Sequence, residues 1–255
     1  MSAVDRHGRP REPFLSRLRD LVRECNRRGI VVDVTLSRGN GVTGPARLPS
    51  AEDHGRAVET LLKALQPQRN WYLDLANERN IQDKRFIAFD ELRQLRQLAR
   101  RVDAKRLITA SHAGDLRPND VRQYIQRVGV DFLSPHRPRD ANSARQTEKW
   151  TRQYQAWMND LGRIVPIHYQ EPFRRGFSRT WEPSEAEFLT DARGALRAGA
   201  AGWCFHNGDQ RDKADGRPRR SFDLSEHRLF EQLDPVQRRV VESLHGLPAN
   251  HKGRF

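Results

Sequence analysis

The stretch Trp71-Tyr72-Leu73-Asp74-Leu75-Ala76-Asn77-Glu78 decides the fold class of this chain. Its first six residues are mostly apolar or aromatic, which is typical of a strand buried on both faces of a parallel sheet. Two polar residues, Asn77 and Glu78, follow directly where the strand would end. The stretch therefore predicts a buried parallel strand with reactive side chains at its carboxyl end.

The same unit, an amphipathic helix followed by a short apolar strand, recurs on both sides of this stretch. Apolar spacing of three and four residues predicts helices near 13–28, 50–65 (capped by Ser50), 88–102, 118–128, 143–161, 184–198 and 225–244. Strands are expected at 30–36, 71–76, 106–111, 130–134, 164–170 and 199–206. Strict alternation with short connections predicts an α/β fold with parallel strands and right-handed crossovers.

Six such strands fit either an open sheet or a barrel. No Gly-rich phosphate loop follows any strand, which weighs against a nucleotide-binding sheet. Polar residues cluster at the strand ends: Asn77 with Glu78, Ser111 with His112, Ser134 with His136, His168 with Glu171, and His206 with Asn207. Active sites of β/α barrels are built at that face, from the ends of several strands. A single domain of TIM-barrel type over residues 1–255 is therefore the favoured interpretation.

The net charge of +13 raises the question of a nucleic-acid partner. Arginine supplies 40 of the 46 basic residues and is scattered along the whole chain, which is typical of solvated helix faces. No run approaches the roughly 18 apolar residues of a membrane span. The first residues have no apolar core of a signal peptide. Neither a nucleic-acid nor a membrane partner is predicted, and localisation stays open.

The stretch from Trp71 to Asn80 resembles the strand-four signature of the clan A glycoside hydrolases, the (β/α)8 superfamily of cellulases and mannanases. In that family an Asn-Glu pair ends strand four, and Pro usually follows where this chain has Arg79. If the Glu78 strand is number four, the Glu171 strand is number seven and the Trp203 strand is number eight. The family places its second catalytic Glu on strand seven and an aromatic platform on strand eight, so three placements agree.

The resemblance implies a retaining glycosidase with Glu78 as acid/base and Glu171 as nucleophile. Such an enzyme holds two carboxylates roughly 5–5.5 Å apart across the scissile bond. One attacks the anomeric carbon, while the other protonates the leaving oxygen and later deprotonates water. The alternative for each Glu is a surface carboxylate paired with one of the many arginines.

Other residues are expected to contact the substrate, an oligo- or polysaccharide. The resemblance assigns Asn77 to the sugar 2-hydroxyl, Trp203 to a stacking platform and His136 to the surroundings of the nucleophile. Tyr169 lies two residues before Glu171 and is expected to share its face and hydrogen-bond it. Trp181, His112 and His206 complete the candidate set; core packing is the alternative for the aromatic residues. The histidines lack metal-binding spacing, so neither a metal nor a cofactor is predicted.

The strand numbering leaves strands one and two of the family without counterparts. The family arginine that hydrogen-bonds the nucleophile comes from strand two, and no position here can be assigned to it. A non-catalytic carbohydrate-binding protein or a truncated remnant of such an enzyme is therefore a second hypothesis. A His-based metal-dependent hydrolase is a third. Sugar and linkage specificity depends on the loops that follow the strands, 38–49, 173–183 and 208–222, whose basic sequences indicate no particular sugar.

Overall fold

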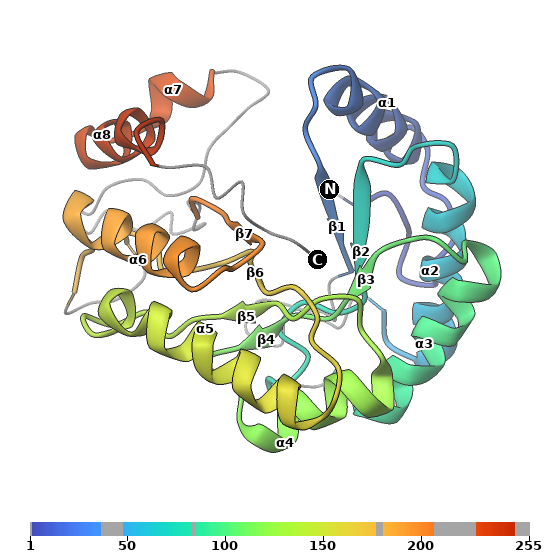
Figure 1. The fold of residues 1–255 in the computed structure, drawn as a ribbon. Coiled ribbons are helices and arrows are strands. Elements are labelled where there is room, and N and C mark those ends of the chain that lie inside the picture. The colour runs from blue at the N-terminus through green and yellow to red at the C-terminus, as the bar shows by residue number, and fades with distance from the viewer. Residues whose placement is uncertain (1, 37–47, 83–84, 177–180, 207–227, 248–255) are drawn as a thin grey trace. The chain divides into compact units, whose positions relative to one another are not determined.

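The computed structural model describes residues 2–36, 48–82, 85–176, 181–206 and 228–247. Helices and short parallel strands alternate along the chain, which confirms the predicted α/β class (Figure 1). The chain divides into two compact units, and each is described by itself. The single-domain organisation expected from the sequence stays a prediction. None of the described helices combines the length and the apolar character needed to cross a membrane.

The first unit comprises Met1–Ala113, Arg117–Ser134 and Leu161–Val165. Its sheet has the order β1-β2-β3, all parallel. The strands are β1 (Val32–Thr35), β2 (Trp71–Asp74) and β3 (Ile108–Thr109), and β4 (His112–Ala113) follows β3 after two residues. The register pairs Val34 with Leu73 and Leu73 with Ile108.

Helices α1 (Phe14–Arg27), α2 (Ala51–Leu65) and α3 (Phe89–Val102) lie along one side of this sheet (Figure 1). Ser50 caps α2 as expected, because its side chain accepts the Asp53 N–H. The apolar stripe of α2 and strand β2 form the centre of the core; fully buried residues there include Val58, Leu62, Leu65 and Leu73, with Leu75 just after β2. This packing fixes the carboxyl end of β2, from which Glu78 projects.

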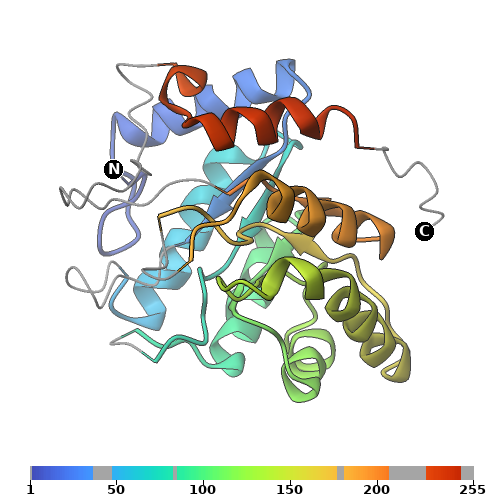
Figure 2. The same ribbon diagram turned by 90° about the vertical axis from the view of Figure 1, so that its left-hand side faces the viewer.

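The second unit comprises Gly114–Leu116, Pro135–Asp160 and Pro166–Phe255. Helices α5 (Ser143–Asp160) and α6 (Glu185–Arg197) pack side by side (Figures 1 and 2). Strand β5 is Pro135–His136, and the parallel strands β6 (His168–Tyr169) and β7 (Gly202–Trp203) pair directly. An aromatic cluster fills the core between α6 and α8 (Pro235–Leu244); it contains Phe173, Phe188 and Val240, with Trp181, Trp203 and Phe205 packed against it.

Three predicted elements differ from the structure. The helix expected near 118–128 is α4 (Pro118–Arg122) continued by the π-helix η1 (Gln123–Val128). In the described part of the closing helix, α7 (Leu229–Gln232) and α8 are separate. Asp234 caps α8 and Pro235 opens it, because a proline without an N–H suits a first turn and breaks a continuous helix.

The third difference concerns the strand expected at 130–134. These residues form no named strand, and β5 begins at Pro135. The carboxylate of Asp131 accepts the Ile108 N–H at 2.7 Å, and the Asp131 N–H donates to the Ile108 carbonyl at 2.9 Å. The Asp131 carboxylate thus accepts a hydrogen bond that a backbone carbonyl would accept in a regular sheet. The named strand of this segment therefore begins only at Pro135.

Candidate active site

Glu78 lies in a tight turn that follows β2. Its φ of 47° is in the left-handed region, which disfavours residues with a Cβ atom. Its N–H donates to the Ser111 Oγ at 2.9 Å, and the preceding Asn77 N–H donates to the Leu36 carbonyl at 3.0 Å. The turn is therefore anchored to the strands on both sides of β2. Asn77 itself is half-buried, and its contact with a sugar stays a prediction.

Arg79, the departure from the family pattern, has a clear structural role. Its N–H donates to the Ser111 carbonyl at 3.2 Å, a bond that proline could not make. Its guanidinium is buried over the ring of Phe89, 3.9 Å from the centroid. Proline at this position would also drive the preceding residue towards extended backbone. Arginine thus permits the left-handed conformation of Glu78.

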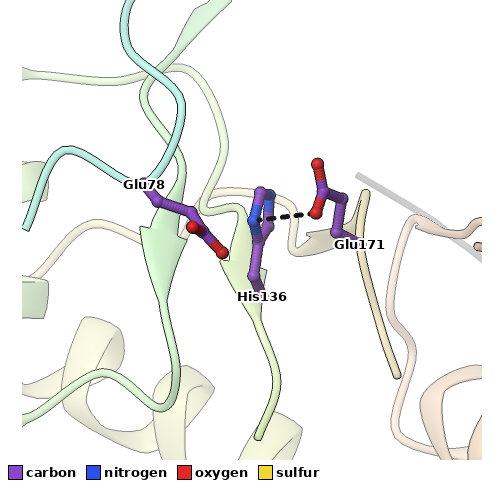
Figure 3. A group of neighbouring side chains, drawn as sticks. All are labelled: Glu78, His136 and Glu171. Atoms are coloured by element: carbon purple, nitrogen blue, oxygen red, sulfur yellow. Dashed lines mark ion pairs between the residues drawn. The ribbon is translucent and has the colours of Figure 1, made fainter. Parts of the chain in front are cut away.

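Glu171 follows β6 by two residues and is surrounded by cationic and imidazole groups. Arg139 donates from Nη2 to the Glu171 Oε2 at 2.9 Å. His136 Nδ1 and His206 Nε2 each lie 3.7 Å from the same oxygen. Figure 3 shows the His136 ring directed at this carboxylate. A single half-buried carboxylate is thus surrounded at the end of β6 by groups from two other segments, the one at β5 and the one after β7.

His206 is neutral in this arrangement, because burial lowers its pKa to about 4. Its Nδ1 lies 3.1 Å from the Pro172 carbonyl, which can only accept, so the proton resides on Nδ1. Nε2 then accepts from Arg174 Nη1 at 3.1 Å. Arg174 and Arg139 thus place positive charge next to the His206 Nε2 and the Glu171 Oε2, which disfavours a cation bound by these two atoms.

Arg139 is the residue that sequence reasoning missed. It lies in the segment after β5 and is nearly buried, with 12% of its side chain exposed. It donates a hydrogen bond to the candidate nucleophile Glu171, the role for which no arginine could be assigned from the sequence. One arginine among 40 carries no sequence signal. Its place three residues after His136, near another strand end, was the only available hint.

The side chains of Tyr169 and Trp203 contact the helices α5 and α6. They are register partners in β6 and β7 and so share one side of the sheet. The Tyr169 hydroxyl lies 2.6 Å from the Thr151 Oγ1 in α5, and the Trp203 Nε1 donates to Asp191 in α6 at 2.5 Å. The expected bond from Tyr169 to Glu171 is wrong. β6 ends at Tyr169, so alternation does not extend to Glu171. Trp203 packs against the helix layer, which favours its structural alternative.

Two further candidates are also held by packing. The Trp181 indole donates to the Glu187 Oε1 at 3.0 Å, and its ring lies 5.2 Å from that of Phe173. This position favours a core role over a subsite wall. In the first unit, His112 is buried with Nδ1 3.3 Å from the Tyr124 hydroxyl. Asn207 lies outside the described residues.

The Asp191 carboxylate that holds Trp203 gives a testable pH dependence. Burial raises its pKa from 3.8 to about 6. The folded chain therefore keeps a proton that the unfolded chain loses, so this stabilisation is complete below about pH 4 and is lost between pH 4 and 6. Relative to Asp191→Asn, the wild type should lose about 3 kcal/mol of unfolding free energy from pH 4 to pH 7. Denaturant unfolding of both proteins at these pH values measures it, and a constant difference would contradict the assignment.

No protein-family model and no curated protein sequence matches this chain. Among solved structures, it is similar to the β-mannanase of Streptomyces thermolilacinus in a structure with mannohexaose, with a TM-score of 0.60 and 13% identity over 95% of this chain and 77% of that one. The fold is that of mannanases and glucanases. The endo-β-1,4-glucanase of Xanthomonas axonopodis pv. citri gives a TM-score of 0.55 and 12% identity, covering 92% of this chain and 81% of the other.

The endo-1,4-β-D-mannanase of Thermotoga petrophila RKU-1 gives a TM-score of 0.54 and 15% identity, covering 91% of this chain and 80% of the other. The mannanase and glucanase fold is thus matched over nearly the whole chain by proteins with little sequence in common with it. The predicted resemblance to cellulase-like and mannanase-like hydrolases is confirmed at the level of the fold.

Proposed function

We propose that this protein is a retaining glycoside hydrolase of β-linked glycans, with Glu171 as nucleophile and Glu78 as acid/base. The observation that carries the proposal is the Glu171 carboxylate at the end of β6, held by Arg139 beside His136. The fold shared with mannanases and an endoglucanase supports a glycan as the substrate. On this proposal the strands are numbers three to eight of a (β/α)8 barrel.

The first step requires an ionised Glu171 that attacks the anomeric carbon. Arg139 supplies a charge-assisted hydrogen bond that fixes the direction of one oxygen. Oε1 is the oxygen left to attack, because Oε2 accepts from Arg139. Neutral His206 cannot protonate the carboxylate near neutral pH, since its pKa is about 4. These features are suited to a nucleophile that must stay charged.

Glu78 serves the opposite role and delivers a proton to the leaving oxygen. As Glu171 attacks, the glycosidic bond breaks, and Glu78 then removes a proton from the water that releases the sugar. The proposal requires the two units to hold both carboxylates roughly 5–5.5 Å apart during the reaction. Inverting hydrolysis would instead need roughly 6.5–9.5 Å and a water between them.

The direct test is the configuration of the first product. The purified chain is incubated with soluble mannan, cellulose-derived and mixed-linkage β-glucans, and new reducing ends are followed by proton NMR. The β-anomer should appear first and then mutarotate to the equilibrium mixture of the α- and β-anomers. Initial release of the α-anomer would overturn the retaining mechanism. Binding without any hydrolysis would support the non-catalytic carbohydrate-binding hypothesis.

Arg139→Met should lower kcat by about 100-fold with little change in KM, because a nucleophile displaced by about 1 Å loses that much rate. Arg139→Lys should recover only part of the loss, since an ammonium does not reproduce the planar guanidinium. Arg145→Met on exposed α5 surface is the matched control and should keep full activity. Steady-state kinetics of the three variants measure this; equal effects of Arg139→Met and Arg145→Met would remove Arg139 from the site.

A further inference from the structure

Glu78 is, among the residues that the structure describes, the one non-glycine residue with a positive φ. An L-residue with a Cβ atom does not adopt this conformation without compensation. Strained backbone of this kind persists where the surrounding contacts impose it, and it is concentrated at functional sites. The contacts that impose it here can be named.

Ser111 holds two consecutive N–H groups of the turn. Its Oγ accepts the Glu78 N–H at 2.9 Å, and its carbonyl accepts the Arg79 N–H at 3.2 Å. The Ser111 side chain is fully buried, so water does not compete for its hydroxyl. Both bonds direct the backbone N–H groups of 78 and 79 towards β3, which turns the chain at Glu78 into the left-handed region.

Asp74 in turn holds Ser111. Its Oδ1 accepts the Ser111 N–H at 3.1 Å and the Ala76 N–H at 3.0 Å. This carboxylate is 1% exposed and bridges the end of β2 to the residues after β3. Asp74 thereby fixes the position of Ser111 relative to the strand that carries Glu78.

We propose that Ser111 and Asp74 are positioning residues that fix the direction of the Glu78 side chain through its left-handed backbone. This inference rests on the proposed function of Glu78 as acid/base. A proton donor acts only within hydrogen-bond reach of the leaving oxygen. Without the Ser111 hydroxyl, the turn relaxes to an ordinary φ and the carboxyl group points elsewhere.

The kinetic test uses Ser111→Ala and a series of aryl β-glycosides with leaving groups of increasing pKa. The substrates carry the sugar that the wild type cleaves, and kcat/KM reports the first step. For poor leaving groups, kcat/KM should fall about 100-fold, because they depend on the acid. For 2,4-dinitrophenyl, which leaves without protonation, it should change little. A uniform fall across the series would assign Ser111 a merely structural role.

Thr109→Val is the matched control. Thr109 is also buried in β3, and its hydroxyl donates to the Phe132 carbonyl at 2.8 Å, away from the Glu78 turn. Its loss should affect every substrate by the same factor. A steeper dependence on the leaving group in Thr109→Val as well would show that any buried hydroxyl of the segment 108–111 has this effect and would overturn the proposal.

A second experiment does not depend on activity. Glu78→Gly and Glu78→Ala both remove the carboxylate, but only alanine keeps the Cβ that disfavours left-handed backbone. Glu78→Gly should therefore melt about 3 °C above Glu78→Ala. When each is combined with Ser111→Ala, the glycine and alanine variants should have the same melting temperature, because the left-handed conformation of residue 78 is no longer imposed. An undiminished difference would overturn the role of Ser111. A wild type that cleaves no glycoside would instead count against the proposed function alone.

Discussion

Glu171→Gln is expected to abolish hydrolysis, with kcat lower by about 10⁵-fold, the size of loss seen when a covalent nucleophile is removed. Glutamine has the same shape and can still accept from Arg139, but its neutral amide oxygen is a poor nucleophile. The fold should therefore survive while the first step fails. Rates on the best substrate, together with the melting temperatures of both proteins, measure this.

Covalent labelling locates the nucleophile independently. A 2-deoxy-2-fluoro glycoside with a good leaving group should add the mass of one fluorosugar to the wild type, and peptide mapping should place it on Glu171. Glu148→Gln is the matched control, because Glu148 is also paired with arginines, Arg152 and Arg197, but on α5. It should be labelled and active like the wild type. Labelling of a different residue would refute the assignment.

Glu171→Gln also distinguishes the retaining mechanism from the metal-dependent hypothesis. If the protein were a His-based metal hydrolase, a chelator would remove activity from the wild type, and Glu171→Gln would keep it. The retaining mechanism predicts that a chelator leaves the activity of the wild type unchanged and that Glu171→Gln removes it. The guanidinium groups of Arg139 and Arg174 around this carboxylate and His206 favour the retaining mechanism.

Glu78→Ala is expected to lower kcat/KM by about 10³–10⁴-fold for substrates with poor leaving groups, the upper range for loss of a general acid. Activated 2,4-dinitrophenyl glycosides should still form the glycosyl-enzyme, which then accumulates because no base activates water. Added azide needs no base. It should attack the anomeric carbon, displace Glu171 and release a β-glycosyl azide.

Pre-steady-state bursts and product analysis with and without azide measure this second prediction. Glu59→Ala removes a solvent-exposed carboxylate of α2 in the same unit and serves as the control. It should behave as the wild type with every leaving group. If azide produced an α-glycosyl azide in Glu78→Ala, or if poor and good leaving groups were affected equally, Glu78 would not be the acid/base.

Much of the fold could be predicted because it depends on local patterns. The stripe of α2, its cap at Ser50 and the apolar run of β2 are each contained in a few consecutive residues. The strand expected at 130–134 could not be placed correctly from the sequence. The Ile108 N–H bonds the Asp131 side chain instead of a backbone carbonyl, and the two residues are over 20 positions apart. Asp234-Pro235 did contain the signal that separates α7 from α8.

The candidate site was predictable only in part. Glu78 and Glu171 could be proposed because polar residues directly follow apolar strands. The direction of the Tyr169 side chain could not be predicted. β6 ends at Tyr169, so the alternation of side chains along a strand does not extend to Glu171. Trp203 was ambiguous in the sequence, since an indole suits a sugar platform and a core equally well; its hydrogen bond to Asp191 in α6 favours the core, and its contact with a sugar stays a prediction.

By itself, the sequence determined the α/β alternation and the two glutamates that follow apolar strands. Only the tertiary structure decided that Arg139 bonds Glu171, that Ser111 and Asp74 hold the turn of Glu78, and that Tyr169 and Trp203 face the helices. The physical reason is the range of each interaction. Periodicity and capping act within a few residues, whereas these hydrogen bonds join segments whose proximity depends on how the strands pair and which face each side chain occupies.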